Sequence, residues 1–384
     1  MAYRTSITSL SKELCSEIFS NSDPKSISIC KSVSKSWNCI VSDTEFTKLY
    51  SQKRPPITGF FYQSSVLNPE KLQYVAVSPH QEYISDPPSC LGFLDSPAIL
   101  VNSCNGLLLW LVEDTKLVIS NPLTKKYIPL DWTFDFVEIY ACGIAFDPSI
   151  SDHFKVILLV VESVGCFKSR VFSSEGMNWG DGIESQVPFK KGLPISSYKG
   201  VFLNGIIYWE LKNQSLLAYN VSDNTSCLIG LPMIKENAMK LSFKRQPACL
   251  GEFNGNLHYC RVFGSMLNVW GSKQMPLVSS ATWALKYQID LCSVTNTYPE
   301  MKFVGSQALA FVDDCNGILM SIEQWIIEVN FLYKAVQRRY RTRINTPSAI
   351  EAAACVHPSM FFPFKQSLAL FNIRKKAHSI HSDD

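Results

Sequence analysis

Cysteine and histidine are the residues in this chain best suited to bind a metal ion or to act as nucleophiles, and their spacing supports neither role. The 13 cysteines include no Cys-x-x-Cys pair, and the close pair His378 and His381 lies in a polar tail. An odd number of scattered cysteines fits reduced, buried thiols better than a disulfide framework or a zinc site. We therefore expect no metal site and no catalytic cysteine.

Phosphate-binding and hydrolytic motifs are also missing from the sequence. A nucleotide would need G-x-G-x-x-G or G-x-x-x-x-G-K-[ST], and a serine nucleophile on a strand-to-helix turn would need G-x-S-x-G; none of these occurs. We expect a protein that is not an enzyme and uses no cofactor. The enzyme alternative is a propeller hydrolase or lyase, which would gather His, Asp or Glu at a central funnel.

The composition favours a packed β protein. Hydrophobic residues make up 46% of the 384 residues and charged residues 18%, with 23 Phe, 15 Tyr and 8 Trp. The net charge of +3 gives no broad basic field, so we expect no nucleic-acid partner. The longest strongly apolar stretch, 156–161, is too short to span a bilayer, and no secretory signal is apparent. We expect no membrane partner and a location in the cytoplasm and/or the nucleus.

Because no catalytic, metal-binding or phosphate-binding motif is found, we turn to the predicted helices and strands, beginning with the first fifty residues. Leu10, Leu14 and Ile18 recur every four residues, which predicts an apolar stripe on a short helix starting near Ser11. Polar residues fill the other face. A stripe on so short a helix has to be covered, either by the rest of the protein or by a partner.

Three further short helices are predicted before residue 52. Asp23 followed by Pro24 predicts the N-cap and first position of the second helix, and Asp43 or Thr44 can cap the last. A unit of this size buries little apolar surface and has more apolar faces than its own core needs. It therefore either binds a partner or caps the following domain.

The same residues resemble an F-box over positions 8–51. The resemblance lies in the order and spacing of Leu10-x-x-x-Leu14, Glu17-Ile18-Phe19, Pro24-Lys25-Ser26-Ile27, Val33-Ser34-Lys35-Ser36-Trp37 and Phe46. An F-box implies docking onto the Skp-type adaptor of a cullin-RING ubiquitin ligase. The positions that match adaptor-contacting or supporting residues are Leu10, Leu14, Ile18 and Ile27. The positions that match the core of the F-box are Phe19, Val33, Trp37 and Phe46.

The F-box pattern differs here at three positions. The family usually has proline after the first leucine and after the first helix, where this chain has Ser11 and Ser22, and Ser34 replaces a frequent cysteine. We expect these changes to loosen the N-terminal loop and weaken adaptor binding while leaving the apolar stripe intact. They leave open an F-box scaffold or decoy that acts outside a ligase.

Beyond a boundary near residue 55 the sequence predicts an all-β domain with an internal repeat. Asn105-Gly106-Leu107-Leu108-Leu109-Trp110 and Asn204-Gly205-Ile206-Ile207-Tyr208-Trp209 superpose, and the same strand entry recurs at Asn254-Gly255 and Asn316-Gly317. The spacings of 99, 50 and 62 residues fit blades of about 45 to 50 residues, with a degenerate copy at 142–148 in the longest gap. We predict a β-propeller of about six blades, with a pair of β-sandwiches as the alternative. Repetition of Trp110 and Trp209 at one blade position favours packing over a binding platform.

This region resembles the F-box-associated domain of a large plant family. The phrases that carry the resemblance are Ser103-Cys104-Asn105-Gly106-Leu107, Ser120-Asn121-Pro122-Leu123-Thr124, Gly143-Ile144-Ala145-Phe146-Asp147-Pro148, Val201-Phe202-Leu203-Asn204-Gly205 and Leu250-Gly251-Glu252. Residues 366–370 are similar to the closing strand of that domain. We therefore divide the chain into an F-box (8–51), a linker with the first strands (52–95), a propeller-like domain (96–372) and a polar tail (373–384). The fold class is a small helical segment followed by a large all-β domain.

The two resemblances imply a substrate-recognition subunit of a Skp–cullin–F-box ligase. The F-box would hold the adaptor, the β-domain would hold an unidentified target protein, and a ubiquitin-charged enzyme elsewhere would perform the transfer. The target-binding residues are unknown. Loops at one rim of the propeller are expected to supply them, with Glu113–Lys116, Asn178–Glu184 and Gly271–Ser280 as candidate segments.

Overall fold

The structure is a computed structural model of the full chain. It describes residues 10–53, 57–63, 72–76, 98–113, 116–130, 139–163, 166–180, 184–185, 199–211, 214–232, 248–272, 283–296, 298, 306–313, 316–322, 325–341 and 361–368. Within these ranges, no helix combines the length and the apolar character that crossing a bilayer would require.

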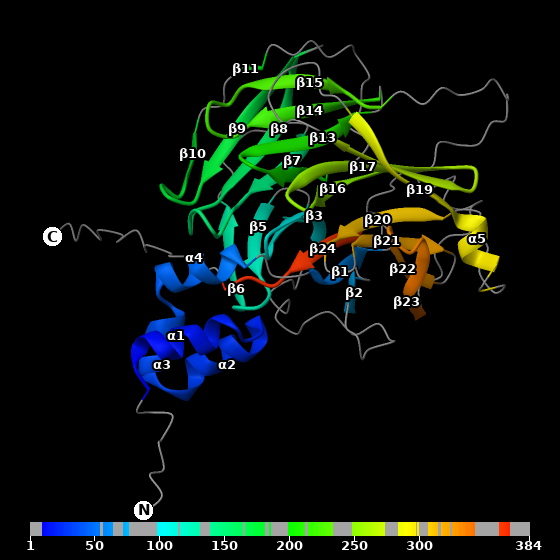
Figure 1. Ribbon diagram of the computed structural model, residues 1–384. Coiled ribbons are helices and arrows are strands. Elements are labelled where there is room, and N and C mark those ends of the chain that lie inside the picture. Colours follow the sequence, from blue (N-terminus) through cyan, green and yellow to red (C-terminus); the bar gives the residue numbers. More distant parts are fainter. Residues whose placement is uncertain are drawn as a thin grey trace, which may run out of the picture.

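Four short helices form the N-terminal part, which we call the helical module (Figure 1). They are α1 (Lys12–Ser20), α2 (Pro24–Val33), α3 (Lys35–Val41) and α4 (Thr44–Gln52). Each begins at a side-chain oxygen that accepts a backbone N–H of the first turn, which is the usual N-cap arrangement. These N-caps are Ser11, Asp23, Ser34 and Asp43. The four predicted helices and the Asp23-Pro24 start are thereby confirmed.

The remaining described strands form six antiparallel sheets. The first holds β3 (Ala98–Cys104), β4 (Leu107–Val112), β5 (Lys116–Asn121) and β6 (Lys126–Leu130). The second holds β7 (Ile139–Ala145), β8 (Lys155–Ser163), β9 (Cys166–Ser173) and β10 (Asn178–Gly180), with β11 (Glu184–Ser185) also paired to β9. The third holds β12 (Val201–Leu203), β13 (Ile206–Leu211), β14 (Ser215–Asn220) and β15 (Ser226–Gly230).

The second half of the chain continues this pattern and then closes it. The fourth sheet holds β16 (Cys249–Phe253), β17 (Asn256–Phe263), β18 (Met266–Ser272) and β19 (Trp283–Asp290), followed by α5 (Leu291–Asn296). The fifth holds β20 (Gln307–Val312), β21 (Gly317–Ile322), β22 (Trp325–Asn330) and β23 (Ala335–Arg341). The sixth has three strands in the order β24 (Phe361–Lys365), β1 (Ile57–Gln63) and β2 (Leu72–Ala76).

The innermost strands of the six sheets contact one another in a ring, in the order β3, β7, β12, β16, β20, β24 and back to β3. A ring of this kind is a β-propeller, so the predicted fold is confirmed and the β-sandwich alternative is wrong. In the sixth blade, β24 from the C-terminal side of the chain lies innermost and pairs with β1 from the N-terminal side, with Phe61 opposite Phe362. The sequence had suggested that residues 366–370 form the closing strand. The strand instead lies just before them, because the buried phenylalanine run ends at Phe364.

Two-residue Asn-Gly turns join the first two strands of three blades. In the β3–β4 turn, Asn105 has φ 43° and Gly106 has φ 90°, and the same conformation recurs at 204–205 and 254–255. Positive φ at both central residues matches the right-handed twist of a hairpin, as the sequence predicted. In the second blade a longer turn, 146–154, takes this place. We call the propeller face that carries these turns the Asn-Gly face.

Trp110 and Trp209 are both fully buried inside blades. The indole Nε1 of Trp110 donates to Ser120 Oγ at 2.9 Å, and that of Trp209 donates to the Cys142 carbonyl oxygen at 3.0 Å in the neighbouring blade. A buried indole with its single donor satisfied is a packing group. The interpretation of these tryptophans as core residues is confirmed.

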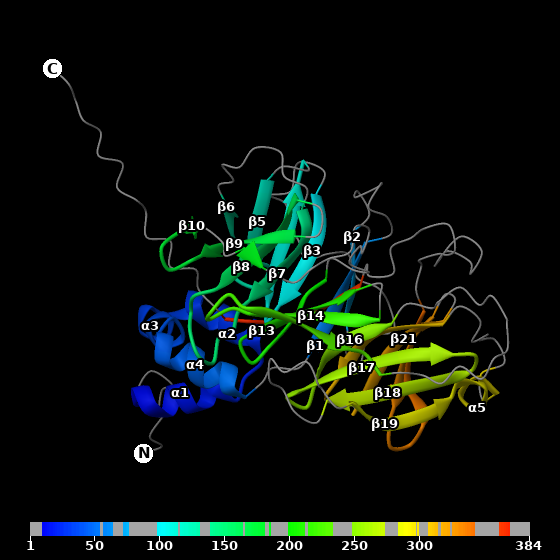
Figure 2. The same cartoon turned by 90° about the horizontal axis from the view of Figure 1, so that it is seen from above.

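The helical module lies at one side of the propeller in both ribbon views (Figures 1 and 2). Two propeller residues pack against its core: Leu123 in the β5–β6 turn and Leu368 just after β24. Because antiparallel strands alternate in direction, the β5–β6 turn opens on the same face as the β3–β4 turn. The module is therefore attached to the Asn-Gly face, next to the first blade.

Candidate docking site

The first helix of the module has two apolar faces. Cys15 and Phe19 are buried in the module core, whereas Leu14 and Ile18, one turn apart, are 49% and 51% exposed. Leu10 is partly buried against the same core. The predicted stripe is therefore split: its first residue turns inward, and the next two lie on the surface.

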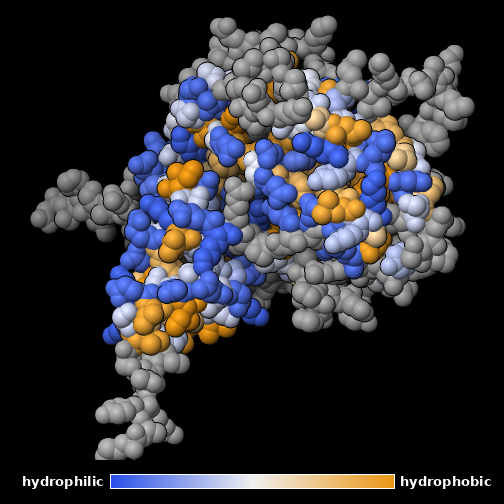
Figure 3. Space-filling view, in the orientation of Figure 1, coloured by the Kyte–Doolittle hydropathy of each residue, from blue (hydrophilic) through white to orange (hydrophobic). Residues whose placement is uncertain are grey.

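Three further apolar side chains of the module are at least half exposed. Ile29 and Val33 of α2 are each 59% exposed, and Leu49 of α4 is 50% exposed. Figure 3 shows apolar surface gathered on the end of the module that is remote from the propeller. Sequence reasoning did not assign Ile29 or Leu49 to the adaptor surface, although the four-residue spacing of Ile29 and Val33 could have indicated a second stripe.

Two of the predicted roles need correction. Val33 was expected to hold the helices together, but it is the last residue of α2 and lies in solvent, so this prediction is wrong. Ile27 was expected to contact or support the adaptor surface, but it is 0% exposed and can only support it from the core. On α2, the side chain that faces inward is Ile27, and the Ile29–Val33 stripe takes the outer face.

The other predicted core residues lie inside the module. Phe19 and Phe46 are buried, and Trp37 is partly buried with its ring edge-on to Phe19, at 5.1 Å between centroids and 70° between planes. Edge-to-face aromatic pairs add about 0.5–1.5 kcal/mol beyond their area burial. The core of the module is therefore complete without the exposed apolar residues.

The serines that replace the usual prolines take part in the fold of the module. Ser11 caps α1, accepting the Leu14 backbone N–H at 3.3 Å, and Ser22 donates its hydroxyl to the Ile18 carbonyl oxygen at 3.1 Å. The Ser22 carbonyl oxygen accepts the Tyr50 hydroxyl at 3.0 Å, and burial raises the pKa of Tyr50 to about 12, so that hydroxyl remains a donor at neutral pH. These contacts hold both serines in the module, which is contrary to the expectation that they loosen the N-terminal loop.

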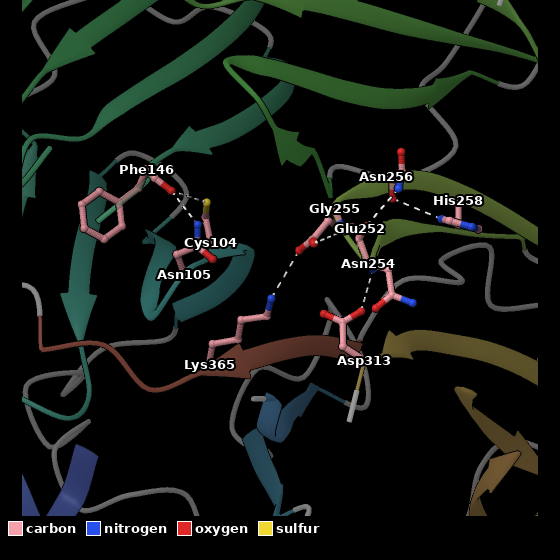
Figure 4. Close-up of polar contacts among 10 residues, drawn as sticks. All are labelled: Cys104, Asn105, Phe146, Glu252, Asn254, Gly255, Asn256, His258, Asp313 and Lys365. Carbon is pink, nitrogen blue, oxygen red and sulfur yellow. Dashed lines mark hydrogen bonds and ion pairs between the residues drawn. The ribbon is translucent and has the colours of Figure 1, made fainter. Parts of the chain in front are cut away.

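A group of polar residues lies at the mouth of the propeller on the Asn-Gly face (Figure 4). Lys365 Nζ lies 3.3 Å from Glu252 Oε2, and Glu252 Oε1 accepts the Gly255 N–H at 3.0 Å. Asp313 Oδ1 accepts the Asn254 N–H at 2.8 Å, which ties the fifth blade to the fourth. These carboxylates accept hydrogen bonds from turns and from the closing strand, an arrangement that fastens blades together.

Hydrogen bonds from the end of β3 and the β3–β4 turn likewise join the first blade to the second. Asn105 Nδ2 donates to the Phe146 carbonyl oxygen at 2.7 Å, and the Cys104 thiol points to the same oxygen at 3.5 Å. Burial raises the pKa of Cys104 to about 12, so its thiol stays protonated and is a poor nucleophile. In the described part of the chain, no three His, Cys, Asp or Glu side chains are placed to share a metal ion.

We predict that His258, a buried residue of β17, makes a contribution to the stability of the fold that is lost in acid. Burial, with a smaller effect of Lys286, lowers its pKa, although a contact with the Asn256 carbonyl oxygen and the charges of Asp313 and Glu252 oppose this. A lowered histidine pKa means that this contribution is complete above the unfolded value of about 6.5 and is lost as pH falls through the folded value. Denaturant titrations at several pH values should therefore show a steeper loss of stability below pH 6.5 for the wild type than for His258→Phe. Parallel curves would contradict the prediction.

The three candidate target segments do not share one face of the propeller. Glu113 and Lys116 flank the β4–β5 turn, on the face opposite the Asn-Gly turns, and are joined by an ion pair of 2.9 Å. Gly271 pairs with His258 close to the Asn254-Gly255 turn, so β18 ends on the Asn-Gly face. Asn178 begins β10, and residues 181–183 and 273–280 lie outside the described part. The expectation that these segments form one rim is wrong.

Comparison with known proteins agrees with both halves of this architecture. Residues 76–369 match the family described as the F-box associated beta propeller domain, and residues 7–49 match the F-box domain. The chain is 27% identical to the Arabidopsis thaliana F-box protein At5g07610 in an alignment 348 residues long, which covers 80% of this chain and 80% of that protein. It is also similar to two further A. thaliana F-box proteins, At3g16210 and At1g47730, with 22% and 25% identity over 59% and 65% of this chain and 62% and 66% of theirs.

Proposed function

The chain belongs to the family of F-box proteins that carry an F-box associated β-propeller domain, and from that premise we propose that it is the substrate-recognition subunit of an SCF-type ubiquitin ligase. The helical module binds a Skp-type adaptor, the propeller binds a target protein, and a separate ubiquitin-charged enzyme modifies the target at raised effective concentration. The chain itself performs no covalent step. It acts in the cytoplasm and/or the nucleus.

One observation carries the proposal: the exposed pair Leu14 and Ile18 on a module whose own core is already filled. Full burial of one such side chain contributes about 1.5–3 kcal/mol, and few residues usually dominate an interface. A pair on one helix face that the fold leaves uncovered is the contact surface that adaptor docking requires. We propose that Ile29, Val33 and Leu49 extend it.

The double variant Leu14→Asp, Ile18→Asp is expected to bind a purified Skp-type adaptor at least about 100-fold more weakly than the wild type, which corresponds to about 2.8 kcal/mol. The reason is that two carboxylates would have to be buried without partners. Isothermal titration calorimetry with the full chain measures the change. The matched control is Ile150→Asp, Leu285→Asp, which places the same charges on exposed propeller residues and should bind like the wild type.

Both variants should melt within about 2 °C of the wild type, because all four side chains are at least 49% exposed. Equal binding by the docking variant and the control would contradict the proposed surface. A folded wild type that does not bind any Skp-type adaptor would instead favour a scaffold or decoy outside a ligase.

A further inference from the structure

The helical module and the propeller share a hydrophobic core at one place. Leu368, three residues after the end of β24, is 1% exposed and belongs to the buried cluster that contains Phe19, Ile27 and Phe46 of the module. Leu123 of the β5–β6 turn packs against the same cluster. A side chain from the C-terminal side of the propeller therefore completes the core of the N-terminal helices.

A buried amide holds this segment in place. Asn121, at the end of β5, is 0% exposed, and its Nδ2 donates to the Ser367 carbonyl oxygen at 3.0 Å. Its Oδ1 accepts the backbone N–H groups of Leu123 at 3.0 Å and Thr124 at 3.4 Å. One side chain thus fixes both Ser367 and the turn that carries Leu123. Buried amides satisfied in this way are costly to disrupt.

The charge of one residue of the first blade acts on α2. Lys31 of α2 is partly buried, and the pKa of its ammonium group is lowered by burial and, to a smaller extent, by the charge of Lys126 at the start of β6.

We propose that Leu368 is a positioning residue, and that the segment 366–368 fixes the angle at which the helical module holds the propeller. The chain joins α4 to β1 by one covalent connection, and a single connection does not define an angle between two parts of a protein, whereas a second attachment at Leu368 does. The consequence for ubiquitin transfer rests on the proposed function: a target on the propeller is presented from one direction, which raises its effective concentration at the charged enzyme.

The test uses the full chain with a donor and an acceptor dye on unnatural amino acids at the exposed positions of Glu45 and Glu175. Single-molecule energy transfer should give one narrow distribution for the wild type, with and without a Skp-type adaptor. Leu368→Ser should broaden this distribution, whereas Leu368→Met, which keeps an apolar side chain at the position, should leave it narrow. Leu123→Ser should also broaden it and leave adaptor affinity within about 3-fold, because it alters only the propeller side of the contact.

A broad distribution for the wild type, or narrow distributions for both serine variants, would overturn the proposal. If Leu368→Ser loses helical circular dichroism together with adaptor binding, Leu123→Ser decides the question alone. Failure of the wild type to bind the adaptor would refute the proposed function and leave the energy-transfer result in the free protein as the test of the attachment. The two failures are therefore distinguishable.

Discussion

Removal of residues 361–384 is expected to leave a chain that has no cooperative unfolding transition. This deletion removes β24, the innermost strand of the closing blade, and with it the buried side chains of Phe361, Phe362 and Phe364. Truncation of a single buried phenylalanine costs about 3–5 kcal/mol, and a whole domain is stable by only about 5–15 kcal/mol. It also exposes the edge of β1, which favours aggregation.

Thermal melting monitored by circular dichroism measures the loss of the cooperative transition, and size-exclusion chromatography measures the aggregation. The matched control is removal of residues 373–384 alone, the polar tail, which should melt like the wild type. A cooperative melt of the longer truncation near the wild-type temperature would show that five blades close without β24, contrary to the ring of contacts described above.

Gly106→Ala is expected to destabilise the protein by about 2–4 kcal/mol, against about 1 kcal/mol for Gly205→Ala. The two glycines occupy the same position in two Asn-Gly turns, with φ +90° and +81°, so the cost of placing alanine in the left-handed region is shared. Their surroundings differ. A Cβ at position 106 would lie 2.3 Å from Ser367 Cβ and 2.9 Å from the Lys365 carbonyl oxygen, whereas a Cβ at position 205 meets nothing within 4 Å.

Denaturant titration of the two variants compares these costs directly, and each serves as the control for the other. Equal destabilisation would mean that the turn conformation alone matters and that residues 365–367 move away without penalty. A larger loss at position 106 would show that the closing strand is packed tightly against the first blade.

The elements that could be predicted from the sequence are those with a local signal. Asp23-Pro24 has the chemistry of a helix start, and Asn105-Gly106 and Asn204-Gly205 have that of a tight hairpin turn, so these elements were found at the correct residues. Repetition of the hairpin then indicated a propeller, because one blade cannot bury its own faces.

The roles that could not be predicted depend on contacts between distant residues. Helical spacing identifies apolar stripes but does not decide which stripe is covered, and so Val33 and Ile27 were misjudged on one helix. The closing blade pairs Phe61 with Phe362, which no repeat or turn signal connects. Leu368 is one leucine among many in the sequence, and only the fold brings it to the helical module.

The closing blade also determines when the protein becomes complete during synthesis. The helical module and β1 leave the ribosome first, whereas β24 and Leu368 follow only after the residues of five blades have been made. A chain whose translation stops early lacks both the strand that closes the ring and the leucine that completes the core of the helices. The closed ring and the completed core of the helical module are therefore obtained in the same late step of synthesis.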